Sequence, residues 1–303
     1  MNTYGLVSRA LGLLRREGVV RSFRSAAAFL NHQTWKQRKT RLQPALNRAK
    51  QYRAYGGAAP ERYRLIRIDP HDIEYILANH FWERLSKFTT HIVGGQWDRN
   101  RTHRRVMLHG PKEGIEEQTL YRVDNYQLYD SAIDHFDNGT PWEETELYRW
   151  LIAEWLETDS NIYMNRYASE SEIRSRLAEL DDLYEHMRDH GYLTQEDIQG
   201  RRDTPLQSPR LAPEHHEVAV DIGRDGEIIL DDGRHRFIVA RALGLERIPV
   251  RVLVRHKRWQ ALRAEVHDAT TVSELSSKAK THLDHPDMRA VLPESIRTDR
   301  EPT

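Results

Sequence analysis

The decisive stretch of the sequence, residues 217–254, reads EVAVDIGRDGEIILDDGRHRFIVARALGLERIPVRVLV. Its first part has two apolar runs joined by the turn GRDG (223–226), which predicts a β-hairpin. The segment RHRFIVARALG (234–244) has apolar residues at helical spacing and ends at a glycine. RIPVRVLV (247–254) then predicts a further strand. Such a strand–turn–helix–strand unit is typical of an α/β or α+β layer.

The turn between the second strand and the helix, DDGRHR (231–236), gathers residue types that bind anions. The first free amides of the helix fall around Gly233, and with the positive end of the helix dipole they favour a phosphate or a carboxylate. Gly233 lets a ligand approach the backbone closely. Side-chain donors come from Arg234, His235 and Arg236, and the arginine fork suits phosphate oxygens.

Two acids stand just before this turn, Asp231 and Asp232. Bare phosphates would be repelled by them, but Mg²⁺ binds both carboxylates and phosphate oxygens. If both acids hold Mg²⁺, the turn has the groups that a site for nucleotide phosphates needs. The alternative, which composition alone favours, is that Asp232 caps the helix, Asp231 is solvated and the arginines pair with the many acidic residues.

The same stretch resembles the ParB/sulfiredoxin superfamily, whose core has a strand hairpin, a Gly-x-x-Arg turn that opens a helix, and an Ile-Pro-Val strand. DGRHR looks like the DGxHR form of its ATP-binding members, which include free-serine kinases and sulfiredoxin. LYEHMRDHGYLTQ (183–195) is similar to the helix before the hairpin, and YRLIRIDPHDI (63–73) to the opening strand. The resemblance implies an α+β domain over residues 60–262. Its first strand would lie near 63–68 and its main core over 183–256, with a helical insertion at about 95–170.

The resemblance also implies roles for single residues. Gly233, His235 and Arg236 match positions that hold nucleotide phosphates in the family, and Asp232 matches the acid of the DGxHR form. Arg234 stands where sulfiredoxins have their reactive cysteine. Since the chain has no cysteine, sulfinic acid reduction is excluded. No helix-turn-helix block follows the core in the sequence, which weakens the case for specific DNA recognition.

These observations favour a phosphotransferase that uses ATP (or CTP) and Mg²⁺ and acts on a small-molecule or glycan hydroxyl. Asp232 would position the metal or the acceptor, and Arg234 would stabilise the charge that develops during transfer. The acceptor hydroxyl also needs a nearby carboxylate, for which the candidates are Asp98 in HIVGGQWDRNR and Glu143 and Glu144 in PWEETELYRW. The alternatives are a tight turn with a packed tryptophan for the first stretch and a capping box for the second.

The first 54 residues form a basic arm. They carry twelve Lys or Arg and a single acid, Glu17, a net charge of +11 in a chain that is neutral as a whole. Apolar residues at helical spacing predict short amphipathic helices in the arm. Such an arm would meet a nucleic acid, an anionic membrane surface or the chain's own acidic body. The main alternative function is therefore a ParB-like nucleic-acid-binding protein, either a nuclease or a CTP-gated DNA clamp.

Other features concern location and the C-terminus. The sequence has no apolar run of the ~20 residues that a membrane span needs, no signal peptide and no cysteine. We therefore expect a cytoplasmic protein, which the arm would place on the inner face of the membrane if it binds lipid. Residues 263–303 are expected to form a polar tail with a short helix at 273–283 and a disordered, charged end.

Overall fold

The computed structural model describes residues 43–61, 64–78, 85, 89–106, 118–158, 169–201 and 216–298. Contacts within the chain define two compact units, residues 1–50 and 51–303. Of the first unit, the described residues are those that begin helix α2 (Gln43–Tyr55). The predicted basic arm, residues 1–54, therefore lies mostly outside the described residues, and its end from Gln43 onward is helical.

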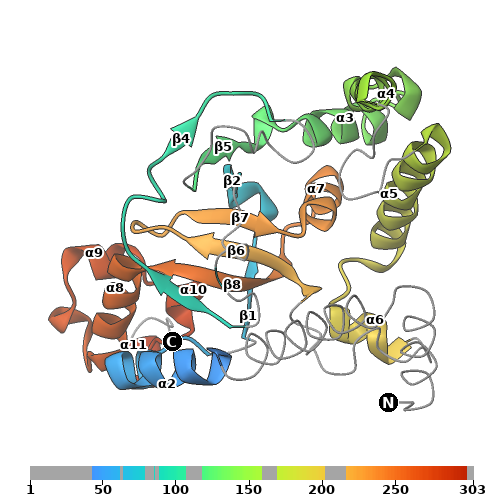
Figure 1. The fold of residues 1–303 in the computed structure, drawn as a ribbon. Helices are drawn as coiled ribbons and strands as arrows, with labels where there is room; N and C mark the ends of the chain where they lie inside the picture. Colours follow the sequence, from blue (N-terminus) through green and yellow to red (C-terminus); the bar gives the residue numbers. More distant parts are fainter. Residues whose placement is uncertain are drawn as a thin grey trace, which may run out of the picture. The chain divides into compact units, whose positions relative to one another are not determined.

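A mixed β-sheet runs through the second unit (Figure 1). Among the described residues its strand order is β1-β8-β6-β7-β2-β5-β4, and β3 also pairs with β8. The strands are β1 (Leu65–Ile68), β2 (Tyr75–Leu77), β3 (His91–Val93), β4 (Arg101–Thr102), β5 (Leu120–Arg122), β6 (Val218–Ile222), β7 (Ile228–Asp232) and β8 (Ile248–His256). The combination of this sheet with separate helices confirms the predicted α+β class.

The decisive stretch, residues 217–254, forms the middle of the sheet. β6 and β7 pair antiparallel as a hairpin, α7 (Arg234–Ala242) follows, and β8 returns parallel to β6. All nine residues of β8 are buried, because its side chains pack into two apolar clusters. The strand also has neighbouring strands along both edges. β1 pairs antiparallel with β8. The predicted hairpin, helix and following strand are confirmed, as is a strand within residues 63–68.

Helices pack on one face of this sheet. α3 (Gln127–Phe136), α4 (Glu146–Thr158), α5 (Glu170–His190) and α7 share one apolar core with the sheet, and α6 (Gln195–Arg201) follows α5. α5 starts after Ser169, whose hydroxyl accepts the N–H of Glu172 at 3.2 Å. It ends at Gly191, which has φ of 70°. In the part of the chain that is described, no helix combines the length and apolarity that spanning a membrane requires.

The segment 95–170, predicted as a helical insertion, is only partly helical. It contains α3 and α4, but also β4 and β5, which extend the sheet beyond β2. Leu120 and Tyr121 of β5 are both fully buried, and their backbone pairs with β2. A strand of three residues has too short an alternation to be read from sequence. Its pairing with a distant segment makes it a strand.

Residues 263–298 are folded, in contrast to the predicted polar tail. Beside α8 (Lys257–Asp268) they form α9 (Ser277–Thr281), α10 (Pro286–Arg289) and α11 (Glu294–Thr298), which lie together in Figure 1. Buried apolar residues from this segment join the main core: Leu275, Ala279, Leu283, Met288, Leu292 and Ile296. The helices are too short to show a clear period in the sequence, and so the segment reads as polar.

A buried ionic cluster fixes this C-terminal segment to the sheet. Asp287 of α10 is fully buried. Its carboxylate accepts hydrogen bonds of 2.9 Å from Nε of Arg255 and from Nε1 of Trp259, and Nε of Arg263 lies 3.1 Å away. Burial alone would raise the pKa of Asp287, but Arg255 and Arg263 hold it well below its usual range.

Candidate functional site

The turn between β7 and α7 is formed by Asp232 and Gly233. Gly233 has φ of 88° and ψ of 30°, in the left-handed region. A Cβ at this position would lie 2.9 Å from Cα of Val218, so the close approach of β6 also requires glycine. The Asp232 carboxylate accepts the N–H of Gly233 at 2.8 Å. Among the described residues no side chain caps the first amides of α7, so Asp232 is not a helix cap.

Arg234, the first residue of α7, points into the protein. Its residue exposure is 8%. Nη2 donates to the carbonyl oxygen of Leu77 at 3.1 Å, and the guanidinium lies 5.5 Å from the centre of the Tyr126 ring. These contacts tie the start of α7 to β2 and to the start of α3. The structure thus places Arg234 in a supporting position below the turn.

His235 is joined at the turn by an arginine from another helix. Nη2 of Arg176, on α5, lies 3.4 Å from Nδ1 of His235. Arg176 also pairs with Glu179 one turn further along α5, and its side chain is 29% exposed. α5 thus brings a positively charged side chain beside the start of α7.

Arg236 is held by a buried carboxylate. Its Nη1 donates to Oε2 of Glu217 at 2.9 Å, Nη2 donates to the carbonyl oxygen of His216, and the guanidinium lies over the Tyr192 ring. Glu217 also accepts the N–H of Gln195 at 2.5 Å. Burial raises the pKa of Glu217 against the effect of these partners. Arg236 therefore links α7 to the loop after α5.

The two acids of the turn differ in their surroundings. Asp231 is fully buried on β7 beside the buried Asp221 of β6. Asp232 is half-buried, with one oxygen on the N–H of Gly233. Within the described ranges, no three His, Asp or Glu side chains are grouped to hold a metal ion. A magnesium ion that keeps several waters and binds phosphates needs only one or two carboxylates from the protein. The half-buried Asp232 can supply such a carboxylate, whereas the fully buried Asp231 cannot.

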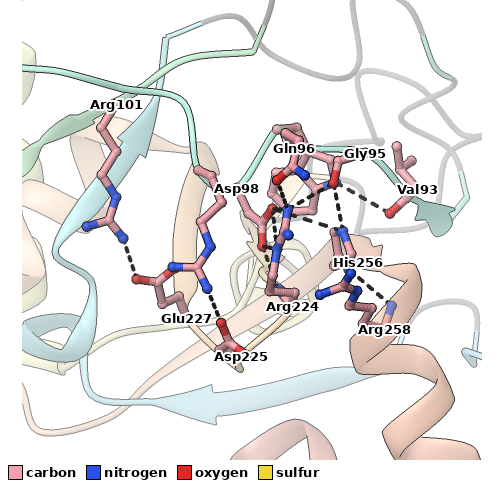
Figure 2. Close-up of polar contacts among 12 residues, drawn as sticks. Val93, Gly95, Gln96, Asp98, Arg101, Arg224, Asp225, Glu227, His256 and Arg258 are labelled. Atoms are coloured by element: carbon pink, nitrogen blue, oxygen red, sulfur yellow. Dashed lines mark hydrogen bonds and ion pairs between the residues drawn. The ribbon is translucent and has the colours of Figure 1, made fainter.

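Asp98 lies beside Arg224 at the turn of the β6–β7 hairpin (Figure 2). This turn is at the opposite end of β7 from Asp232. Its buried carboxylate accepts the backbone N–H of Arg224 at 2.8 Å, and Nη2 and Nε of the Arg224 guanidinium at 2.6 and 2.9 Å. Arg224 stands in the hairpin turn. Burial alone would raise the pKa of Asp98, but the hydrogen bonds from Arg224 hold it below its usual value. Asp98 therefore fixes its own loop to the turn of the hairpin.

Further contacts fasten the same loop along the hairpin (Figure 2). Arg99 pairs with Asp225, and Nη2 of Arg101 lies 2.6 Å from Oε1 of Glu227. From this end, β7 runs five residues to Asp232, a distance of roughly 13 Å at the usual rise per residue. The structure does not bring Asp98 to the β7–α7 turn.

Glu143 and Glu144 belong to a short 3₁₀ helix, η6 (Trp142–Glu144), that packs on α5. The Trp142 indole donates to Asp181 at 2.7 Å, Glu143 pairs with Arg174, and the Glu144 carbonyl accepts from Arg149. The predicted capping box is not formed, because α4 begins only at Glu146. The contacts of η6 lead to the helix that carries Arg176, and they do not reach the turn itself.

Sequence reasoning missed three residues around the turn: Arg176, Glu217 and Asp221. Nothing in the sequence distinguishes Arg176 from the other arginines of α5. Glu217 and Asp221 did leave a signal, because Glu217 directly precedes and Asp221 lies within the apolar run of β6, whose five residues are all buried. A charged residue in a buried strand indicates a specific polar partner.

Comparisons with known proteins assign no family to this chain. A scan against protein-family models, a search of the curated proteins and a search of the solved structures each found no match.

Proposed function

We propose that the protein binds a nucleotide through its phosphates at the N-terminus of α7 and transfers the terminal phosphate to a hydroxyl group. The observation that carries this proposal is the start of α7 at Gly233, which no side chain of the described residues caps, with His235 and Arg176 beside it. The backbone amides at a helix start and the helix dipole attract an anion. Two side chains from different helices, one of them an always-charged arginine fork, add donors for phosphate oxygens.

The roles of the turn residues follow from their contacts. Gly233 allows close approach, and Arg234 and Arg236 hold α7 in place through Leu77 and Glu217. We propose that Arg176 binds the phosphates, a role that the sequence predicts for Arg234 and Arg236. Asp232 is the proposed ligand of Mg²⁺, which would neutralise charge on the phosphates when bound.

Two observations support assigning the chain to the ParB/sulfiredoxin-like superfamily. The hairpin, the turn, α7 and β8 follow one another in the expected order, and β1 lies beside β8. The helix that ends at Gly191 precedes the hairpin, as the resemblance implies. This assignment supports ATP or CTP as the ligand.

For the acceptor side we propose Glu143 and Glu144 rather than Asp98. Both glutamates lie on η6, which packs on α5, and α5 carries Arg176. Asp98 lies at the far end of the hairpin with its buried carboxylate held by Arg224, whereas the pair between Glu143 and Arg174 is exposed. The proposed acceptor is a small molecule or a glycan with a free hydroxyl.

Calorimetric titration with ATP, ADP and CTP tests nucleotide binding. Arg176→Ala and His235→Ala are each expected to weaken ATP binding about tenfold or more, because each removes a donor to the phosphates. Arg188→Ala is the matched control, since Arg188 lies on the same helix, is exposed and pairs with its neighbour Asp189. No binding of any nucleotide by the unaltered protein would end this proposal.

A second candidate function is nucleic-acid or membrane binding through residues 1–54, favoured by their charge of +11. The end of this arm in α2 exposes Leu46 and Tyr52 among Arg48, Lys50 and Arg53. Apolar and basic side chains together suit an anionic lipid surface. We expect the full chain to float with vesicles that contain anionic lipid, and deletion of residues 1–54 to abolish flotation. Salt-sensitive DNA binding without flotation would favour nucleic acid instead.

A further inference from the structure

The strand β1 forms one end of the sheet. Among the described residues it pairs with β8 on one side, and no strand pairs with it on the other. Such an edge presents unpaired backbone N–H and C=O groups, to which a further strand can add. The question is therefore which groups of β1 point outward and what lies beside them.

The register with β8 shows which backbone groups point outward. Arg67 lies opposite Pro249 in the antiparallel pair. Proline has no N–H, so this pair cannot be one of the hydrogen-bonded kind, and the two residues direct their backbone groups away from each other. The N–H and C=O of Arg67 therefore point to the open edge, and the described residues give them no other backbone partner. Leu65, two residues earlier, has the same orientation.

A cavity of about 730 Å³ lies along this edge. All four residues of β1 line it, together with the flanking Arg64 and Asp69. Pro286 and Arg289 of α10, which contacts β1, also line it. An added strand would lie about 5 Å from β1. The fold thus leaves room beside the outward-pointing backbone groups.

The charges around the cavity are balanced and ordered along the chain. Its lining contains four arginines and four acidic residues, so a purely acidic or purely basic partner would meet as many repulsive as attractive charges. Arg64 and Arg67 stand toward the start of β1, whereas Asp69 and Asp72 follow its end. When two such edges run antiparallel, the basic end of one meets the acidic end of the other. The edge is therefore complementary to itself.

We propose that β1 is a dimerisation strand, whose outer edge pairs antiparallel with β1 of a second copy of this chain. In such an interface each contact occurs twice. An arginine within an edge strand usually hinders pairing, but here the register that sets Arg67 opposite the second copy's Asp69 forms two opposite-charge pairs. Arg67 forms no ion pair with a described residue, and the Asp69 side chain is 42% exposed beside His71. This inference does not depend on nucleotide binding.

Sedimentation velocity of the full chain over a range of concentrations tests the proposal. We expect a species of twice the mass of one chain. Arg67→Pro removes an N–H that β8 does not use, and proline is tolerated at such positions of edge strands, so this variant should be folded and monomeric. Arg67→Ala keeps the N–H and loses only the two charge pairs, so the dissociation constant of its dimer should rise about tenfold.

A charge exchange keeps the proposal testable if Arg67→Pro does not fold. Arg67→Asp sets acids opposite each other and should be monomeric. Adding Asp69→Arg to it exchanges the two signs and should restore the dimer, which a misfolded variant could not do. Arg122→Asp is the matched control, because it makes the same change at an exposed arginine of β5, away from this edge, and should stay dimeric.

Two results would overturn the proposal. The first is an unaltered chain that is monomeric at every concentration, which would leave the edge to solvent or to another partner. The second is a dimer that persists unchanged in both Arg67→Pro and Arg67→Asp, since another surface would then hold the two copies together.

Discussion

Replacing Asp98 by alanine is expected to destabilise the protein by about 3–5 kcal/mol without changing its affinity for ATP. The substitution leaves the buried guanidinium and backbone N–H of Arg224 without their carboxylate. The loss is large because an uncompensated buried charge remains. Urea unfolding measures it, and ATP titration at a temperature where both proteins are folded checks the affinity.

The effect of Asp98 should also depend on pH. Because the folded protein lowers the pKa of this carboxyl, its stabilising contribution is present above the ordinary aspartate pKa of about 4 and disappears as the pH falls through the lower folded value. The difference in stability between the two proteins should therefore shrink in acid.

Asp225→Ala is the control for this prediction, because Asp225 is on the same turn and its pairs with Arg99 and Lys278 are exposed. Exposed pairs contribute at most about 1 kcal/mol. An Asp98→Ala protein that is as stable as the parent but has lost phosphate transfer would instead assign Asp98 to catalysis.

Gly233→Ala is expected to cost about 2 kcal/mol or more in stability and to lower ATP affinity at least about tenfold. At φ of 88° an alanine is strained, and its Cβ would meet the Val218 backbone at 2.9 Å. The strand and the turn must move apart to accept it, which displaces the amides that are proposed to bind phosphate. Thermal unfolding and ATP titration measure the two effects.

Gly244→Ala is the matched control for this substitution. Gly244 follows the other end of α7 at φ of 63°, and a Cβ there meets no atom within 4 Å. It should cost about 1–2 kcal/mol through backbone strain alone and leave ATP affinity unchanged. Equal ATP affinity in Gly233→Ala and the parent would place the phosphate elsewhere.

The middle of the fold was predictable because its signals are local. In residues 217–254 the turns are marked by glycine and aspartate, and strand and helix each have their own apolar period. The structure has the same elements in the same order. The Gly233 turn was predictable for the same reason, since a glycine between a strand and a helix with positive φ has few substitutes.

The remaining parts depend on distant pairs that a single sequence does not display. β4 and β5 are strands because of their pairing with each other and with β2. The segment of α9 to α11 is folded because its apolar residues join the main core and Asp287 meets Arg255 and Arg263. Arg176 joins the site because α5 packs on α7, 59 residues away along the chain. Such contacts follow from the tertiary structure rather than from periodicity.

We propose that phosphate binds at the first amides of α7. Amide NMR spectra of the ¹⁵N-labelled protein, recorded during addition of ATP, report on these amides one by one. We expect the largest chemical-shift changes at Gly233, Arg234, His235 and Arg236, and we expect these changes to be lost in the Arg176→Ala protein. Shifts that are absent, or that centre on other segments while these four amides stay unchanged, would contradict it.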